Sequence, residues 1–163
     1  MFTLKSLSPA AIDSALAKAE RYRLLNEPGE AESICLDVLA VQSDHQGALI
    51  MLLLALTDQF GEVTGAHQRA RELLPSLHHE YDRAYYAGII AERRAKAQLA
   101  RRTLSAGAYE WLMEAMSSYE RAEALRPPGN DDALLRWNAC ARFIERHPHL
   151  RPSDESTEIE MLE

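Results

Sequence analysis

The side chains in this chain best suited to metal binding or proton transfer are six histidines. They are His45, His67, His78, His79, His147 and His149. No two of them stand four residues apart, the spacing that lets two imidazoles on one helix face share a zinc ion. The adjacent His78 and His79 would point about 100° apart on a helix, so they would not converge on one metal. The sequence therefore predicts no metal site and no cofactor.

The sequence also contains no motif typical of nucleophilic or acid–base catalysis. The two cysteines, Cys35 and Cys140, both stand among apolar neighbours, where a thiol usually behaves as a small hydrophobe. The chain has no serine elbow, no phosphate-binding glycine loop and no dinucleotide-binding fingerprint. Glu110 and Glu114 are one helical turn apart, but so are many surface carboxylates. We therefore expect no catalytic residues and a protein that is not an enzyme.

A basic cluster is the densest group of charged side chains, and only Glu92 stands among its members. They are Arg93, Arg94, Lys96, Arg101 and Arg102. Two interpretations stay open. Such a run is typical of a solvated helix face, but it also suits an anion or an acidic protein. We treat this basic patch as a candidate binding site.

The chain as a whole is acidic, with 18 Lys and Arg against 25 Asp and Glu and a formal net charge of −7. This charge argues against nucleic acid or an anionic membrane as the main partner. The longest uncharged apolar run, residues 48–56, is far shorter than the roughly 20 residues that span a bilayer. The start of the chain lacks the apolar stretch of a signal peptide, so we expect a cytoplasmic protein.

Helices must position these side chains, because Ala and Leu far outnumber Val and Ile. Caps and breakers predict seven helices, over residues 8–25, 28–41, 44–59, 61–75, 81–102, 106–126 and 131–146. Within this pattern we expect Ser8 and Asp44 to cap helices, and Asn26 and Gly61 to form turns. The sequence predicts one helical domain over residues 1–150 and an acidic, disordered tail over residues 151–163.

An internal repeat signal appears in the sixth predicted helix. Ala115, Tyr119, Ala122 and Pro127 follow one another at spacings of four, three and five residues. This pattern resembles the second half of a tetratricopeptide repeat, a helical hairpin that wants small, aromatic, small and proline residues there. Weaker copies extend the resemblance over about residues 8–146. Its alternative is an irregular helical bundle in which these spacings arise by chance.

The resemblance implies an all-α fold of stacked hairpins, a short right-handed α-solenoid of about seven helices. Gly88 falls at the small site where the two helices of the third hairpin cross. Ala115 lies further along the chain than the family's spacing places it. We therefore expect the third hairpin to be elongated.

In this family the first helices of successive hairpins line a concave groove that binds segments of partner proteins. By that resemblance the groove is lined by Leu16, Glu20, Arg23, Ile50, Met51, Leu54, Tyr85, Tyr86, Ile89, Arg93, Arg136 and Arg142. An apolar lining with an arginine rim suits an acidic or amphipathic protein segment. Whether Ile50, Met51 and Leu54 belong to the groove or to the core stays open, because the whole run around them is apolar.

The resemblance therefore predicts a non-catalytic scaffold or adaptor that binds a protein or peptide segment. Two alternatives stay open. One is a structural subunit that forms a homodimer through the elongated hairpin, and the other is a small secretion-type chaperone. Residues 158–163 alternate acidic and apolar side chains as a groove ligand would, so the tail is either a solubilising end or a ligand for such a groove.

Overall fold

The chain folds into helices and loops. The computed structural model describes residues 1–101 and 106–152, and this part contains seven α-helices and no strand. They are α1 (Ile12–Leu24), α2 (Pro28–Val41), α3 (Gln46–Thr57), α4 (Ala66–Leu73), α5 (Glu80–Ala100), α6 (Ala106–Leu125) and α7 (Asp132–Arg146). Three short 3₁₀ turns, Pro9–Ala11, Leu74–Ser76 and Pro148–Leu150, complete the helical content of that part. The prediction of an all-α fold with seven helices is confirmed.

No described helix is both long enough and apolar enough to span a bilayer. The predicted disordered tail falls almost wholly on residues 153–163, which lie outside the described residues.

Turn residues set several helix ends as their chemistry requires. Asn26 adopts a left-handed φ of 60° between α1 and α2, as predicted. Gly129 does the same between α6 and α7, with φ 83°. At the start of α7, the Asn130 side-chain oxygen accepts a hydrogen bond from the Asp132 backbone N–H at 3.0 Å. These local bonds satisfy backbone groups that a helix end leaves unpaired.

Two predictions of caps and turns were wrong, and one was right in part. His45, not Asp44, caps α3, because its Nδ1 accepts a hydrogen bond from the Ala48 N–H at 3.1 Å. Ser8 occupies the N-cap of the 3₁₀ turn Pro9–Ala11 that leads into α1, as predicted, but its side chain makes no capping bond. The turn into α4 is at Gly65, with φ 85°, and not at Gly61.

The late turn at Gly65 has a physical reason. Phe60 follows α3 and is buried in the core, and residues 57–63 continue as hydrogen-bonded turns, so α4 does not begin before Ala66. The loop between α3 and α4 is long as a result, and α4 keeps only eight residues.

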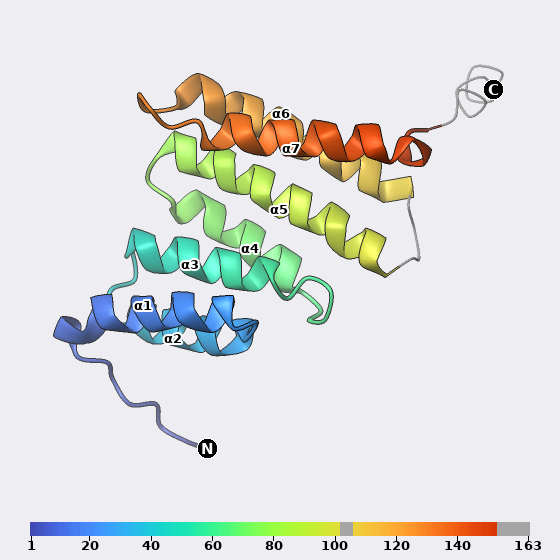
Figure 1. Ribbon diagram of the computed structural model, residues 1–163. Helices are drawn as coiled ribbons and strands as arrows, with labels where there is room; N and C mark the ends of the chain where they lie inside the picture. Colours follow the sequence, from blue (N-terminus) through green and yellow to red (C-terminus); the bar gives the residue numbers. More distant parts are fainter. Residues whose placement is uncertain (102–105, 153–163) are drawn as a thin grey trace.

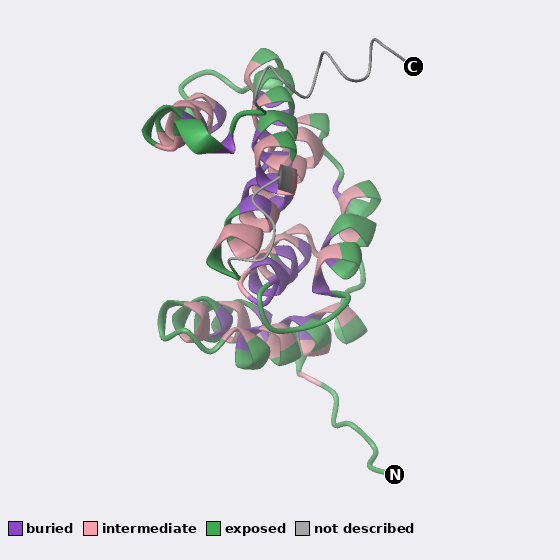
Figure 2. Ribbon diagram, turned by 90° about the vertical axis from the view of Figure 1, so that its right-hand side faces the viewer, coloured by how far each residue is buried: buried purple, intermediate pink, exposed green. Residues whose placement is uncertain are grey.

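The helices form two layers. Each helix packs against the next one in sequence, α1 also contacts α3, and α3 contacts α5. In Figure 1, α1, α3, α5 and α7 lie in the layer nearer the viewer, with α2, α4 and α6 behind them. Figure 2 shows the front layer at the left, where the outer helices project past the middle ones. The surface of the front layer, formed by α1, α3, α5 and α7, is therefore set back in its middle. We call this surface the recessed face.

The third hairpin is elongated, as the sequence predicted. Helix α5 has 21 residues and α6 has 20. The first hairpin has helices of 13 and 14 residues, and the second has helices of 12 and 8. This hairpin also carries the most extensive packing between any two helices of the chain's described part.

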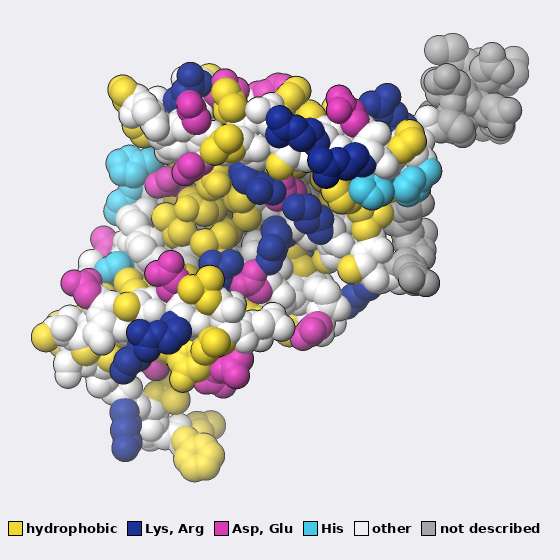
Figure 3. Space-filling view, in the orientation of Figure 1, with side chains coloured by type: hydrophobic (Ala, Val, Ile, Leu, Met, Phe, Trp, Pro, Cys, Tyr) yellow, Lys and Arg dark blue, Asp and Glu magenta, His cyan; other side chains and the backbone are white. Residues whose placement is uncertain are grey.

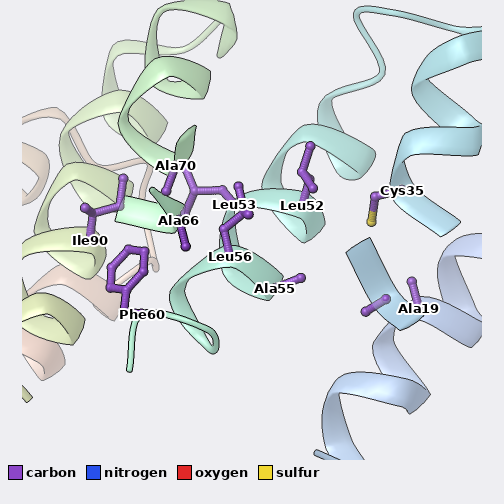
Figure 4. Close-up of a cluster of buried hydrophobic side chains, with 11 residues drawn as sticks. Ala19, Cys35, Leu52, Leu53, Ala55, Leu56, Phe60, Ala66, Ala70 and Ile90 are labelled. Carbon is purple, nitrogen blue, oxygen red and sulfur yellow. The ribbon is translucent and has the colours of Figure 1, made fainter. Parts of the chain in front are cut away.

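Two main hydrophobic clusters form the core. The first joins α1 to α4, and Figure 4 shows its leucines from α3 between Cys35 and Ala19 on one side and Phe60 and Ile90 on the other. The second joins α5, α6 and α7 around Leu112 and Tyr119. Helix α5 serves both clusters, because Ile90 packs into the first while Ala91 and Ala95 pack into the second.

The predicted crossing site in the third hairpin is confirmed. A Cβ atom added at Gly88 would lie 2.5 Å from Cε1 of Tyr119, whose side chain is fully buried. Ala115 and Ala122, the small residues on either side of Tyr119 in the repeat pattern, are also fully buried. The tyrosine ring therefore fills the space that glycine leaves at the crossing.

Candidate functional site

An aromatic and apolar surface covers the first half of α5 on the recessed face. Tyr85 and Ile89 lie about 40° apart around α5 and Tyr86 about 100° from Tyr85, by the 3.6-residue turn. All three are half-buried. The Tyr81 ring stacks on that of Tyr85 at 5.8 Å between centroids, and Tyr86 meets Tyr85 edge-on at 5.0 Å. We call Tyr81, Tyr85, Tyr86 and Ile89 the aromatic floor.

Burial changes the chemistry of these phenols. It raises the pKa of Tyr86 to about 12 and moves the pKa of Tyr85 upward as well. An ordinary tyrosine is already uncharged at pH 7, and burial keeps these phenols uncharged to a higher pH. Half-buried aromatic rings of this kind offer apolar contact and hydroxyl groups to a ligand.

Helix α3 lies beside the aromatic floor. It carries the three residues whose place, groove or core, could not be decided from the sequence. Ile50, Met51 and Leu54 are each half-buried, whereas Leu49, Leu52, Leu53 and Leu56 on the same helix are buried. Met51 and Leu54 pack against the first core cluster and still keep exposed surface. On α1, Leu16 is half-buried and Glu20 is exposed. Figure 3 shows the resulting hydrophobic patch in a hollow over α5, between α3 and α7.

A row of ion pairs crosses the second half of the recessed face. Asp58, which follows α3, accepts hydrogen bonds from Arg23 of α1, with Nε to Oδ2 at 2.7 Å, and from Arg93 of α5. Glu92 of α5 accepts from Arg136 of α7, whose Nη2 lies 2.6 and 2.5 Å from its two oxygens. Lys96 lies 3.5 Å from the same carboxylate. We call these six residues the ion-pair row.

The row has a layered structure. The Glu92 side chain is 3% exposed and that of Asp58 is 16%, whereas those of Arg136, Arg93 and Lys96 are 34%, 39% and 44% exposed. Burial alone would lower the pKa of Arg136, but its hydrogen bonds to Glu92 and the charge of that carboxylate hold it above its usual range. The carboxylates therefore lie beneath the cations, and the surface of the row is positive (Figure 3).

The predicted basic patch is not gathered on one face. Arg93 and Lys96 lie in the ion-pair row, but Arg94 is about 180° from Tyr85 around the helix. Its guanidinium carbon lies 5.9 Å from the Trp111 ring centroid, on the side of α6. Arg101 donates to the carbonyl oxygen of Gly61. Arg102 lies outside the described residues.

Arg142, also on α7, does not lie beside Arg136 in the ion-pair row. It comes six residues after Arg136, a rotation of roughly 240° around the helix, and it is exposed. It makes no ion pair within the described part of the chain. The remaining predicted groove residues are half-buried or exposed on α1, α3, α5 and α7.

The two thiols lie in the core. Burial raises the pKa of Cys35 to about 11, and burial together with the charge of Glu92 raises that of Cys140 to about 12. The Cys140 Sγ donates to Glu92 Oε1 at 3.1 Å. Neither thiol is a thiolate at neutral pH, and the thiolate is the form that reacts.

Two of the histidines, His67 and His147, pack against aromatic rings. His67 lies between the Phe60 and Trp111 rings, at 5.5 and 5.3 Å, and burial lowers its pKa to about 4. His147 stacks on Phe143 at 4.2 Å. Among the described residues, no group of three or more His, Cys, Asp or Glu side chains is placed to hold a metal ion.

Sequence reasoning missed the two carboxylates that organise the site. Asp58 is the first charged residue after the apolar run of α3, and Glu92 stands four residues before Lys96. The second spacing is a signal for an ion pair within a helix. The partners Arg23 and Arg136 come from 35 and 44 residues away in the chain, so helix packing alone brings them there.

Comparison of the chain with protein-family models, with curated proteins and with solved structures finds no match.

Proposed function

We propose that this chain is a non-catalytic adaptor of tetratricopeptide-like architecture that binds a segment of a partner protein on the recessed face. The observation that carries the proposal is the juxtaposition there of a half-exposed aromatic and apolar surface with a row of cations. Large aromatic side chains and arginine are the residues that most often dominate protein–protein binding. Exposed apolar patches bordered by polar groups typically mark such sites.

The arrangement of the helices supports the repeat architecture. Successive helices pack on one another, and α3 also contacts α1 and α5 across hairpins. The small residues and the tyrosine of the repeat pattern are buried at the helix crossing. Two distant, buried free cysteines suit a reducing compartment, so we place the protein in the cytoplasm.

The test compares two variants that differ only in the face they change. Met51→Ser with Ile89→Ser alters the recessed face at half-exposed positions on α3 and α5. Leu36→Ser with Met113→Ser alters exposed positions on α2 and α6, the other layer. Each tagged protein is used to capture partners from lysate, after circular dichroism has shown that both variants keep the wild-type helix content and melting temperature.

We expect the recessed-face variant to lose at least one protein that the wild type and the control retain. Identical recovery by all three would refute binding on this face. If the wild type then shows concentration-dependent mass by light scattering, the self-assembling subunit replaces the adaptor as the favoured function.

A further inference from the structure

The ion-pair row carries more positive than negative charge. Asp58 is shared by Arg23 and Arg93, and Glu92 is shared by Arg136 and Lys96. Four cations therefore face two carboxylates, and the carboxylates are the less exposed partners. This surplus stands out in a chain of net charge −7. A ligand approaching the row meets partly exposed cations that have spare hydrogen-bond donors.

The chain itself contains two segments with apolar side chains that could reach such a surface. The first is the N-terminal arm, residues 1–8, where Phe2 and Leu4 are 97% and 85% exposed. The arm carries Lys5 and no acidic residue, so the positive row repels it. The second is residues 153–163, which contain five acidic residues, no basic residue and the apolar Ile159, Met161 and Leu162. Charge therefore favours the second segment.

The point where the chain leaves the described structure suits this choice. Helices α5 and α7 end on the same side of the molecule, and the chain continues from there through Pro148–Leu150, which packs against α6 and α7 (Figure 1). From the end of α7 back to Arg136 is roughly 15 Å along the helix. Eleven residues span up to roughly 36 Å when extended. The segment is long enough to pass the row and reach the aromatic floor.

We propose that residues 153–163 bind the recessed face of their own chain. The acidic side chains pair with the surplus cations Arg93, Lys96 and Arg136, and Ile159, Met161 and Leu162 pack on the aromatic floor. The inference rests on the proposed function, because a segment held there occupies the surface that a partner needs. It makes the tail a competitive regulator and predicts that the partner segment is itself acidic and apolar.

The test uses the full chain and a fluorescein-labelled synthetic peptide of residues 153–163, followed by fluorescence anisotropy. A neutral-tail variant carries Asp154→Asn, Glu155→Gln, Glu158→Gln, Glu160→Gln and Glu163→Gln. The peptide should bind this variant at least tenfold more tightly than the wild type. A tethered segment has an effective concentration of about a millimolar, so the acidic tail of the wild type competes with the peptide.

A second pair of variants, both made in the neutral-tail chain, tests the row. Arg93→Gln with Lys96→Gln removes the two most exposed cations and leaves each carboxylate one basic partner, Arg23 or Arg136. Lys18→Gln with Arg21→Gln makes the same charge change at exposed positions of α1. We expect the row variant to lose at least tenfold in peptide affinity and the control to lose less than threefold.

Three results would overturn the inference. They are no peptide binding by the neutral-tail variant, equal binding by that variant and the wild type, and equal losses in the row variant and its control. Failure of the proposed function is distinguishable. If Met51→Ser with Ile89→Ser loses a captured partner but the neutral-tail variant binds no peptide, the proposed function stands and regulation by the tail is refuted. If the chain binds the peptide at the row while both capture variants recover the same proteins, the tail binds its own chain but regulates no partner at this face.

Discussion

At the scale of single residues, the recessed face depends on carboxylates that lie beneath their basic partners. Glu92 is almost fully buried, yet it holds Arg136 of α7 and Lys96 of its own helix in place. A buried carboxylate without cations would be very unfavourable, so the cations are also needed for folding. Binding and stability are therefore coupled at this position.

Replacing Glu92 should destabilise the fold by leaving Arg136 without its partner. For Glu92→Gln we expect the free energy of unfolding to fall by about 2 kcal/mol, less than for a fully buried pair because Arg136 is partly exposed. Urea denaturation of Glu92→Gln, Arg136→Gln and the double variant gives the coupling energy, which should exceed about 1 kcal/mol. The exposed pair Glu123 and Arg126, at 3.2 Å, is the matched control and should couple by less than about 0.5 kcal/mol. Equal coupling in both pairs would contradict this account.

The crossing of α5 and α6 gives a second prediction at this scale. Gly88→Ala places a methyl group 2.5 Å from the buried Tyr119 ring, so the helices must separate. We expect a loss of about 1–3 kcal/mol in the free energy of unfolding. Gly29→Ala is the control, because nothing lies within 4 Å of its added Cβ in α2, and it should be neutral or stabilising by up to about 1 kcal/mol. If the two variants were equally stable, tight packing at this crossing would be disproved.

At the scale of elements, the helices could be predicted because their signals are local. Pro28, Asn26 and Gly129 act on the backbone of their own turns, and α2 has the predicted bounds. The start of α4 could not be predicted in this way. It depends on where Phe60 is buried, which is a consequence of tertiary packing. In the same way, the arginines of the groove could be predicted from the sequence, but their carboxylate partner could not. Asp58 meets Arg23 and Arg93 only because three helices pack together.

Helix α4 contains a group that makes the fold sensitive to pH. His67 has a pKa of about 4 in the folded chain against 6.5 for a free histidine, because burial and the nearby Arg94 and Arg71 disfavour its charged form. The stabilising effect of a neutral His67 is therefore complete above pH 6.5. Between pH 6.5 and pH 4 the unfolded chain binds a proton at His67 and the folded chain does not, so the free energy of unfolding falls as the pH drops through this range. After allowance for partial exposure, we expect this loss to be about 1–2 kcal/mol.

His67→Phe should remove that loss, since a phenyl ring fits between Phe60 and Trp111 and does not titrate. Urea unfolding at pH 7.5 and pH 4.5 measures the change for both proteins, so that contributions from other groups cancel. The variant should lose about 1–2 kcal/mol less than the wild type between these pH values. An equal loss in the two proteins would show that His67 is not the group responsible.

At the scale of the whole molecule, α5 joins the two halves. It supplies Ile90 to the first core cluster and Ala91 and Ala95 to the second. The ion-pair row adds contacts from α1 to α7 across the same helix. Helices stacked on their neighbours can in principle unfold piecewise. A helix packed into both clusters opposes this, because neither half can unfold without exposing part of the other.

We therefore expect cooperative unfolding, and Trp137 allows a direct test. Trp137 packs against the second cluster, whereas Trp111 also contacts His67 of α4, so the parent chain for this test carries Trp111→Phe. The fluorescence of Trp137 then reports on the C-terminal half, whereas circular dichroism at 222 nm reports on all helices. Leu53→Ala removes a fully buried side chain from the first cluster and should cost about 2–5 kcal/mol. If α5 couples the clusters, this distant substitution lowers the urea midpoint measured by tryptophan fluorescence as much as the midpoint measured by circular dichroism. A fluorescence midpoint that stays at the wild-type value while the dichroism midpoint falls would show that the two halves unfold independently.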